Sequence, residues 1–495
     1  MILPATPKAG AAREQGQALP RPDSQAGARV ASAAAAVARL DAWLETMRTR
    51  AAGAARAHVP RGYGGPVAHW WQQSLLYTGA GLDWRYEGII TGYLELWGRT
   101  LPGQHRQDER WLTKARRAGD DLISGQLESG NFAESAFEIN PATAGTPHEA
   151  ACDAGLLRLA LELRWTGHSG WESYAACAER NLRSFYIGQL WNPEALMIGD
   201  HPWRQSGPVT FVPNKAATAC EALFLMAELS GESRWVEEYA LPTLRWIQEH
   251  QLRGRKPAGG RGRSSSGERL RGAIAQNSIG TRRINKYFPL YNARCISALL
   301  QGYRWTGDEG YAESALGAMD FIARFAQGDG SLPTVVYPGA RASTTPSWLA
   351  PLGDILRAAD ELAPLGFSAD LSATEARLLG GQDESGGFQT ARGFADQAGR
   401  SRTATRAQAL PDVRDVLHVT GWCDKAFRYL ASHAGSQIPA GLSAPFETDC
   451  ILRGRAMHLV ETPDLLEITS QGAVCYRWVK GEPWPQIASP EFWLR

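Results

Sequence analysis

Two carboxylates at helical spacing are the first residues of this sequence that could do chemistry. Asp83 and Glu87 are four residues apart, and they flank the aromatic residues Trp84 and Tyr86. If a helix begins by Asp83, both carboxylates lie on one face near its N-terminus. Aromatic rings beside carboxylates offer a sugar ring both stacking and hydrogen bonds. The alternative interpretation is an N-cap followed by a first-turn acid, with no chemical role.

Polar and aromatic residues also stand at the start of each later apolar stretch with helical spacing. They are His148, Glu149 and Asp153; Asn214, Lys215 and Glu221; Tyr287, Tyr291, Asn292 and Arg294; Trp348 and Asp354; and Trp422, Asp424 and Lys425. A helix that is packed on both sides should be mostly apolar, so polar residues in its first two turns need a ligand or water. We therefore expect one ligand site at these helix starts.

The element that must position these residues is a repeated helical hairpin. In its clearest copy, residues 291–332, apolar residues recur at helical spacing, Gly307 ends the first helix, Asp308 caps the second and Gln327 begins the exit turn. The other copies leave through Gln126, Gln189, Gln251 and Gln382. A repeat of roughly sixty residues with two helices per copy predicts a ring or a solenoid.

A closed ring accounts best for the two unpaired helices at the ends of the repeats. Residues 422–433 form a lone helix after the last hairpin, and the Ala-rich stretch 30–56 supplies its partner. Closure hides two apolar ends that would otherwise need capping repeats. The fold class that we predict is all-α, an (α/α)6 toroid in which the inner helices start at one common mouth.

Composition divides the chain into a core and less regular segments. Residues 1–29 are expected to be a disordered lead, and the toroid is expected over 30–445. The Gly-, Ser- and Arg-rich insertions 253–272 and 389–411 are expected to be mobile. Short alternating runs separated by turn residues predict a small antiparallel β tail over 446–495, packed on the toroid.

The composition excludes several partners. A net charge of +1 gives no reason to expect nucleic acid, and no apolar run reaches the about 18 residues of a membrane span. The seven cysteines stand singly, which is typical of small core residues and of a reducing compartment, so we expect a cytoplasmic protein. His418, Cys423 and Asp424 have poor spacing for zinc, and we expect neither metal nor cofactor. No particular oligomeric state is indicated.

The hairpin exits carry a family resemblance. The patterns Gln-x-x-x-Gly-Asn-Phe from Gln126 and Gln-x-x-x-Gly-Gly-Phe from Gln382 resemble the α/α toroid superfamily over residues 30–445. That superfamily includes terpene cyclases, protein prenyltransferases and many carbohydrate-active enzymes. The resemblance implies the toroid architecture more specifically than any one chemistry.

Two segments narrow the resemblance. Residues 84–88, followed by 92–97, are similar to the first inner helix of unsaturated glucuronyl hydrolases, and residues 148–153 are similar to the segment with that family's catalytic aspartate. This resemblance implies that Asp153 is the general acid/base and that Asp83 or Glu87 is its partner. The first expectation is therefore glycoside hydrolysis. The expected substrate is an anionic or uronate-containing saccharide, either an oligosaccharide or a smaller molecule. The residues expected to bind it are Trp84, Glu149, Asn214, Lys215, Asn292, Arg294, Trp348, Trp422 and Asp424.

Other activities remain open. A metal-free polysaccharide lyase or sugar epimerase would use Tyr287 or Tyr291 as proton shuttle, Asn292 and Arg294 to neutralise a uronate, and His148 as base. A divergent terpene cyclase shares the fold, but its Asp-x-Asp-Asp and Asp-Asp-x-x-Asp motifs are absent from the sequence. A toroid that binds a glycan or a protein without chemistry is the third alternative.

Overall fold

The structure of the protein is a computed structural model. It describes residues 24–49, 61–68, 75–77, 81–98, 108–133, 149–204, 207–253, 266–394, 410–435, 437–482 and 485–489. Within these ranges, no helix is long and apolar enough to cross a membrane. The seven cysteines all lie within them, buried and free, as expected of small core residues.

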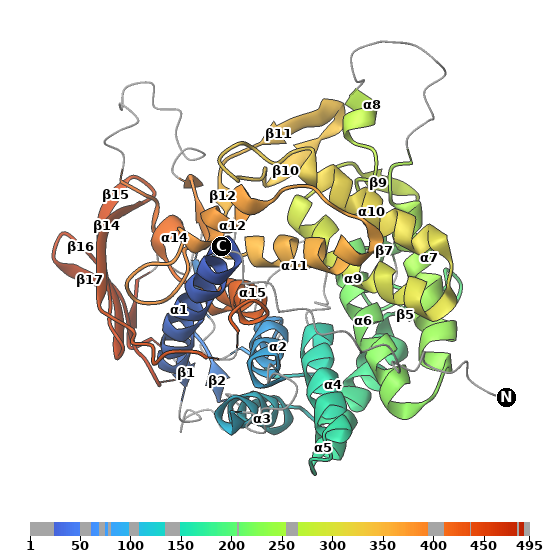
Figure 1. The fold of residues 1–495 in the computed structure, drawn as a ribbon, viewed down its shortest axis with the longest axis horizontal. Helices are drawn as coiled ribbons and strands as arrows, with labels where there is room; N and C mark the ends of the chain where they lie inside the picture. The colour runs from blue at the N-terminus through green and yellow to red at the C-terminus, as the bar shows by residue number, and fades with distance from the viewer. Residues whose placement is uncertain are drawn as a thin grey trace, which may run out of the picture.

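An inner ring of helices surrounds the axis of the molecule (Figure 1). Its members are α2 (Arg85–Gly98), α4 (Glu149–Trp165), α6 (Pro213–Ser230), α9 (Pro289–Thr306), α11 (Leu352–Leu362) and α15 (Thr420–Ala431). Each helix contacts the next in this order, and α15 contacts α2. The ring is therefore closed, as the repeat pattern predicted.

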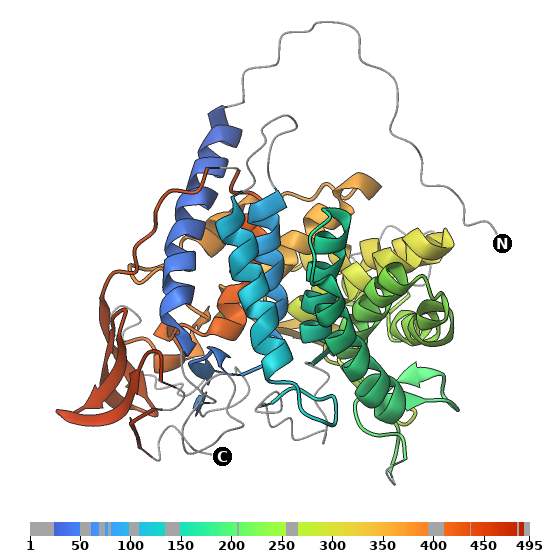
Figure 2. The same cartoon turned by 90° about the horizontal axis from the view of Figure 1, so that it is seen from below.

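An outer helix covers each inner one. These helices are α3 (Glu109–Ser124), α5 (Trp171–Asn181) with η2 (Leu182–Leu190), η3 (Trp235–Ala240) with α7 (Leu241–Glu249), α10 (Glu309–Ala323), α12 (Ser372–Leu379) and α1 (Ser24–Thr46). The helix α1 packs on α15 and supplies the last outer position, so the N-terminal helix closes the ring. Figure 2 shows α1 standing beside the inner helices.

Local sequence signals end and restart the helices as expected. After α9, Gly307 adopts a left-handed φ of 72°, which an L-side chain rarely adopts. Asp308 then caps α10, because its carboxylate accepts a 2.9 Å hydrogen bond from the Gly310 N–H. The turn and cap that the sequence predicted are thus confirmed.

The recurring exit glutamines join one hairpin to the next. The side-chain amide of Gln126 donates to the Cys177 carbonyl on α5 at 2.8 Å. The equivalent amides of Gln251 and Gln382 donate to the Ser314 carbonyl on α10 and the Ala36 carbonyl on α1, at 2.7 and 2.9 Å. The glutamine recurs in these exits because it satisfies a backbone carbonyl of the neighbouring hairpin.

The loops carry short strands and single helical turns. The strands are β1 (Arg48–Thr49), β2 (Gly62–Tyr63), β3 (Pro66–Ala68), β4 (Leu75–Tyr77), β5 (Trp191–Asn192), β6 (Met197–Ile198), β7 (Thr210–Phe211), β8 (Asn277–Ile279), β9 (Arg282–Ile284), β10 (Val335–Tyr337), β11 (Arg341–Ser343), β12 (Ser347–Trp348) and β13 (Ala391–Arg392). The turns are α8 (Ser266–Arg269), η4 (Pro338–Ala340), η5 (Ala363–Leu365) and α14 (Val413–Val416). These strands pair antiparallel, and the pairs β7–β8 and β12–β13 join different loops.

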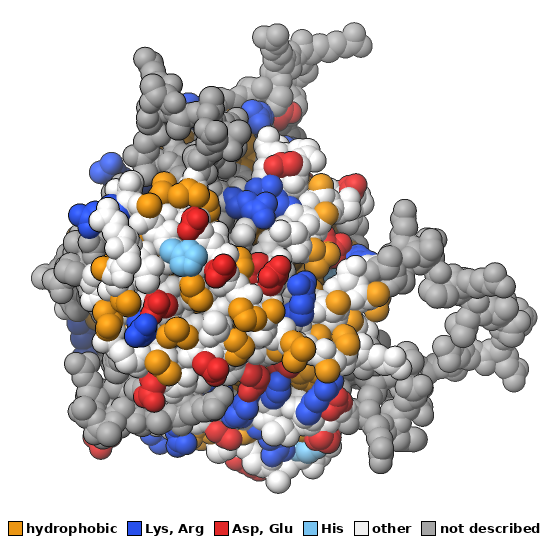
Figure 3. All heavy atoms as spheres, turned by 90° about the vertical axis from the view of Figure 1, so that its left-hand side faces the viewer, with side chains coloured by type: hydrophobic (Ala, Val, Ile, Leu, Met, Phe, Trp, Pro, Cys, Tyr) orange, Lys and Arg blue, Asp and Glu red, His pale blue; other side chains and the backbone are white. Residues whose placement is uncertain are grey.

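A five-stranded antiparallel sheet follows the toroid. Its strands, in order, are β14 (Phe446–Leu452), β15 (Arg455–Glu461), β16 (Leu465–Ser470), β17 (Ala473–Val479) and β18 (Ile487–Ala488). The sheet packs on α1, where Trp43 Nε1 donates to Glu461 at 2.7 Å and Lys480 Nζ donates to Thr46 at 3.1 Å. Figure 3 views the molecule from this side, and acidic and basic side chains are interspersed on that face.

Several expected boundaries need correction. The helix α1 begins at Ser24 and ends at Thr46, whereas the Ala-rich pattern predicted residues 30–56. Residues 1–23 of the expected lead, and the insertion residues 254–265 and 395–409, lie outside the described residues. The flanks of the insertions are ordered because they join neighbouring structure, as α8 and as β13, which pairs with β12.

Candidate functional site

Charged side chains fill the middle of the inner ring. We call Glu87, Glu221, Arg294, Asp354 and Arg428 the axial charge network. Glu87 Oε1 accepts from Arg294 and from Arg428, both at 2.9 Å. Arg428 Nε also donates to Asp354 at 2.8 Å, and Arg294 lies 3.5 Å from Glu221. These residues come from five different inner helices, so their partners are set by closure of the ring.

The network fixes the charge of Glu87. Burial opposes ionisation, but the guanidiniums of Arg294 and Arg428 outweigh it and hold the pKa of Glu87 well below its ordinary value. Glu87 is 2% exposed. It is therefore an ionised carboxylate at neutral pH, which suits charge stabilisation and excludes proton donation there.

Asp83 does not share a helix face with Glu87, because α2 begins at Arg85. The Asp83 carboxylate accepts from the Arg85 side chain at 2.8 and 3.0 Å and from the Arg85 backbone N–H at 3.1 Å. It is fully buried. These contacts are in keeping with the capping role that was the alternative to chemistry, and a chemical role for Asp83 stays a prediction.

Asp153 lies on the side of α4 that faces the outer helix. Burial, and then the Asp153 carboxyl, raises the pKa of Cys177 on α5 to about 12. Neither Asp153 oxygen has a hydrogen-bond partner among the described residues. Burial, and then the nearby Glu149, raises the pKa of Asp153 well above its ordinary value. Arg158, five residues later, instead approaches Glu221 on the axis at 3.5 Å.

Glu149 shares the Asp153 side of α4 and holds the hairpin together. Its carboxylate accepts from Asn131 in the exit turn after α3 at 3.0 Å and from Asn181 at the end of α5 at 2.5 Å. The preceding residue, His148, lies outside the described residues. These contacts of Glu149 are those of a residue that fixes a turn.

Three tryptophans meet at the N-terminal ends of the inner helices. We call Trp84, Trp348 and Trp422 the aromatic triad. The ring centroids of Trp84 and Trp422 are 5.8 Å apart, and those of Trp348 and Trp422 are 5.2 Å apart. Trp84 Nε1 donates to the Gly421 carbonyl at 2.5 Å, which fixes its ring against α15. The triad joins segments that lie far apart in the sequence.

Asp424 follows Trp422 by two residues on α15, is fully buried, and has its Oδ2 facing Gly88 on α2. Its Oδ2 accepts from Lys425 at 2.6 Å, and Lys425 Nζ also reaches the Trp84 carbonyl at 3.4 Å. Burial raises the pKa of Asp424 to about 7, although Lys425 and Arg428 act in the opposite direction. Asp424 Oδ1 has no hydrogen-bond partner in the described part of the chain. A carboxyl group with this pKa can give or take a proton near neutral pH.

The polar residues predicted on α6 and α9 have partners within the chain. Lys215 Nζ donates to Asp200 at 2.9 Å. The Asn292 side chain accepts from the Ile274 N–H at 2.6 Å and donates to the Ile274 carbonyl at 3.1 Å. Asn214 lies half-buried at the start of α6. The burial of Lys215 and Asn292 is thus explained without a ligand.

The two predicted tyrosines pack against aromatic neighbours. Tyr287 is 3% exposed, pairs through its backbone with Val336, and places its ring 6.3 Å from that of Phe321. The Tyr291 ring lies 4.9 Å from that of Phe288. The structure therefore brings together Trp84, Glu87, Arg294, Trp348, Trp422 and Asp424, and places the two tyrosines in packing positions.

Arg357 and Arg428 were not among the predicted residues. Arg428 joins Glu87 to Asp354, and Arg357 pairs with Glu361 one turn later on α11. Arg428 lies past the first two turns of α15, and Arg357 lies in the second turn of α11. A charged residue in the middle of a helix that is covered on both sides is the sequence signal that could have found them.

Comparison with known proteins supports the architecture. No family model matches the sequence, and no curated protein matches it. An unsaturated glucuronyl hydrolase from a Bacillus species has a TM-score of 0.52 and 13% identity, covering 82% of this chain and 96% of that chain.

Two other solved structures share the arrangement. Cellobiose 2-epimerase from Bacillus thermoamylovorans has a TM-score of 0.52 and 10% identity, covering 78% of this chain and 94% of its own. A possible GH105 family member from Klebsiella pneumoniae has a TM-score of 0.52 and 9% identity, covering 85% and 95%. At these identities the likeness shows the fold alone. The chain has the α/α toroid fold of these proteins.

Proposed function

We propose that the protein is a carbohydrate-active enzyme that binds a saccharide against the aromatic triad. The observation that carries this proposal is the packing of three tryptophans at the start of α15, where Asp424, a buried carboxyl group whose pKa is raised to about 7, follows Trp422 by two residues. Indole faces stack on the apolar face of a sugar ring, and a carboxyl group of near-neutral pKa can protonate a glycosidic oxygen. The shared fold with a glucuronyl hydrolase and a sugar epimerase is in keeping with it.

Glycoside hydrolysis is the first reaction that we propose. It needs one proton donor and one ionised carboxylate. Asp424 suits the first role, and Glu87, held ionised by Arg294 and Arg428, suits the second, as the stabiliser of positive charge on the sugar. Asp153 remains the acid that the family resemblance implies, but its position towards α5 gives this role less support.

Elimination and epimerisation have less support from the geometry. Both would draw on Tyr287 or Tyr291 as a proton shuttle. Tyr287 is buried against Phe321, and burial raises its pKa above the ordinary value, which disfavours the phenolate. We propose that the substrate of the hydrolytic reaction is an anionic saccharide, uronate-containing or otherwise.

The proposal can be tested by ligand-induced stabilisation followed by product analysis. Purified protein would be heated with uronate-containing oligosaccharides, neutral oligosaccharides and isoprenoid diphosphates, since a bound ligand raises the melting temperature. We expect a rise with saccharides that is lost in Trp422→Ala. New reducing ends would indicate hydrolysis, and ultraviolet absorbance of an unsaturated uronate would indicate elimination. Stabilisation by diphosphates alone would contradict the proposal.

A further inference from the structure

A cavity of about 1040 Å³ opens at the C-terminal ends of α2, α4, α6 and α9. We call it the C-terminal cavity. Its inner end meets the axial charge network, because Thr91 follows Glu87 by one turn of α2 and Arg158 lies 3.5 Å from Glu221. The aromatic triad lies at the N-terminal ends of the inner helices. The cavity and the triad therefore approach the network from opposite ends.

Polar atoms without a hydrogen-bond partner gather where the cavity meets the network. Among the described residues, the lining atoms Thr91 Oγ1, Arg158 Nε and Gln301 Oε1 have no such partner. The same holds for both carboxylate oxygens of Glu221, which is fully buried. Arg158 and Arg294 approach Glu221 only to 3.5 Å, which is longer than an N–H···O hydrogen bond. Buried polar groups are normally hydrogen-bonded, so this set needs ordered water or a ligand.

The unsatisfied atoms include both donors and acceptors. Arg158 Nε donates, the oxygens of Gln301 and Glu221 accept, and the Thr91 hydroxyl can do either. A hydroxyl group accepts from a donor and donates to an acceptor, so a molecule with several hydroxyls can satisfy the whole set. An ammonium group only donates and a carboxylate only accepts, so either would leave part of the set unpaired. Buried groups that stay unpaired weaken binding.

Charged side chains of both signs line the cavity. They are the acidic residues Glu95, Glu162 and Glu228 and the basic residues Arg158 and Arg304. Burial raises the pKa of Glu162, and the charge of Glu95 acts in the same direction. Burial also raises the pKa of Glu228, although Arg158 opposes this. Both shifts favour the neutral acid, so the acidic side chains do not greatly outweigh the basic ones. The described lining therefore favours a ligand without net charge.

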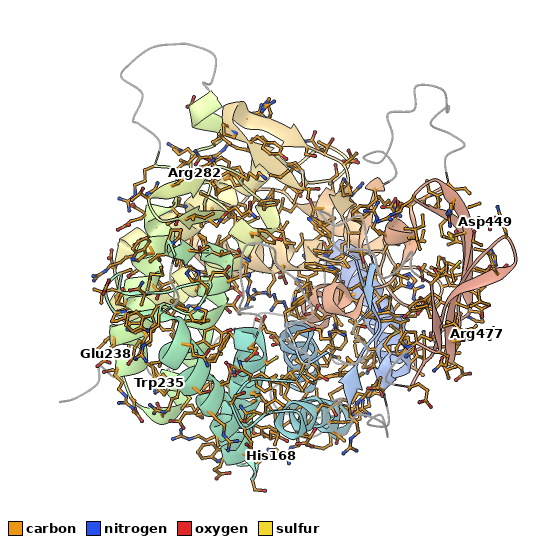
Figure 4. The ribbon with its side chains drawn as sticks, turned by 180° about the vertical axis from the view of Figure 1, so that it is seen from behind. His168, Trp235, Glu238, Arg282, Asp449 and Arg477 are labelled. Atoms are coloured by element: carbon orange, nitrogen blue, oxygen red, sulfur yellow. The ribbon has the colours of Figure 1, made fainter. Side chains whose placement is uncertain are left out.

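Two exposed indole rings also line the cavity. Trp165 ends α4 and is 64% exposed, and Trp305, near the end of α9, is 40% exposed. His168, labelled in Figure 4, follows Trp165 by three residues and shows where this end of α4 lies. Trp305 packs edge-on against Phe224, with ring centroids 6.1 Å apart, which fixes its orientation. Exposed indole faces beside a cavity of ligand size are typical of a binding site and can stack on the apolar face of a sugar.

We propose that the C-terminal cavity binds a neutral saccharide. Its hydroxyls pair with Thr91, Arg158 and Gln301, and its apolar face stacks on the ring of Trp165. The volume of the cavity is that of a site for a small molecule. This saccharide differs in charge and in place from the anionic substrate proposed at the aromatic triad. Its binding does not depend on the reaction proposed there.

Calorimetric titration of the full chain tests the ligand class. The neutral probes are cellobiose and maltose. The charged probes are cellobiouronic acid, in which a carboxylate replaces one hydroxymethyl group of cellobiose, and a glucosamine disaccharide, which carries ammonium groups. We expect saturable binding of at least one neutral disaccharide at millimolar concentration, and binding of both charged ones that is at least about tenfold weaker. Equal binding of a charged disaccharide, or no binding of either neutral one, as in a cavity that holds only water, would overturn the proposal.

Variants test the location. Thr91→Val combined with Gln301→Leu removes two acceptor atoms with which no described residue pairs, so the fold should be retained. Binding of the neutral disaccharide should weaken at least about tenfold. Trp165→Ala should weaken it roughly threefold. Thr113→Val, at an exposed position of α3, is the matched control and should leave binding unchanged. Melting temperatures without ligand check that each variant folds.

A variant at the aromatic triad separates this proposal from the function proposed there. Trp422→Ala should leave binding of the neutral disaccharide unchanged, whereas it should abolish the stabilisation by the anionic substrate. Loss of neutral-disaccharide binding in Trp422→Ala would place that saccharide at the triad. Binding that survives both the double substitution and Trp165→Ala would place it elsewhere on the molecule. Either result would overturn the assignment to the C-terminal cavity.

Discussion

The axial charge network and the interior of the α4–α5 hairpin both bury carboxylates on inner helices, with opposite results. On the axis, two guanidiniums hold the pKa of Glu87 well below its ordinary value. Between α4 and α5, Asp153 has no hydrogen-bond partner in the described chain, and burial raises its pKa well above the ordinary value. Carboxyl groups at similar burial thus have a lowered pKa in one place and a raised pKa in the other.

The difference teaches that helix face decides the role of a buried acid in this fold. Side chains on the axial face meet those of other inner helices, where Arg294 and Arg428 can reach them. Side chains on the outward face meet one outer helix and its turn. Asp424 is an intermediate case. Burial raises its pKa, and Lys425 and Arg428 offset only part of that rise.

The largest effect is expected at Asp424. Asp424→Asn keeps the side-chain volume but removes the proton, so turnover should fall by about 10²–10⁴. Asp153→Asn should retain turnover within about threefold on the same substrate, because its carboxyl group faces α5. Rates on the saccharide selected by thermal shift, measured with circular dichroism as a check of folding, compare the two variants. A reversed order would transfer the acid role to Asp153.

Breaking the axial charge network should destabilise the fold strongly. Arg428→Met leaves Glu87 and Asp354 without their shared partner, and such a loss costs about 3–5 kcal/mol of unfolding free energy. Urea denaturation measures it. Arg477→Met is the control, since Arg477 is 42% exposed on the β tail (Figure 4) and its ion pair should contribute about 0–1 kcal/mol. A loss below about 1 kcal/mol for Arg428→Met would contradict the importance of the network.

A second paired site joins the β tail to the toroid. His418 Nδ1 lies 2.5 Å from Glu461, Nε2 contacts Asp383, and these carboxylates raise the pKa of His418 to about 10 although burial opposes this. Because the pKa of His418 is raised in the folded state, protonated His418 stabilises the fold fully at pH values below its unfolded pKa of about 6.5. This contribution is lost as the pH rises through about 10.

We therefore expect the stability of the native protein to decline by about 3 kcal/mol between pH 7 and pH 10 through this group. His418→Asn should remove most of that slope, because it has no proton to lose. Melting temperatures over the pH series provide the measurement, with His458→Asn, an exposed histidine on β15, as control. An equal dependence of the melting temperature on pH in both variants would show that His418 does not hold the β tail against the toroid.

The smallest effect is expected from Asp153 on stability. Because the pKa of Asp153 is raised in the folded state, its contribution to stability is fully present below about pH 4. This contribution is lost as the pH rises towards the pKa of Asp153 in the folded protein. Asp153→Asn removes the acid and should make the protein about 1–2 kcal/mol more stable at pH 7 than the native chain. Denaturant titration at pH 4 and pH 7 checks this. Destabilisation at pH 7 would indicate that the Asp153 carboxyl has a partner in the native protein.

The order of elements could be predicted because its signals are local. Gly307 and Asp308 mark a turn and a cap by their own conformational and hydrogen-bonding properties, and the exit glutamines Gln126, Gln251 and Gln382 each satisfy a backbone carbonyl of the neighbouring hairpin. The strand β14 was harder to predict from the sequence. Its first half alternates between half-buried and exposed residues, and most of them are polar.

The sequence by itself determined the hairpins, their closure into an α/α toroid and the aromatic character of one mouth, because helical periodicity and capping act between residues near one another in the chain. Tertiary structure alone decided which carboxylates are paired. Glu87 meets Arg294, 207 residues away, while Asp153 faces α5. A helical period places Glu149 with Asp153 on one face but does not show whether that face turns to the axis or to the outer layer, and the surrounding charges decide the pKa.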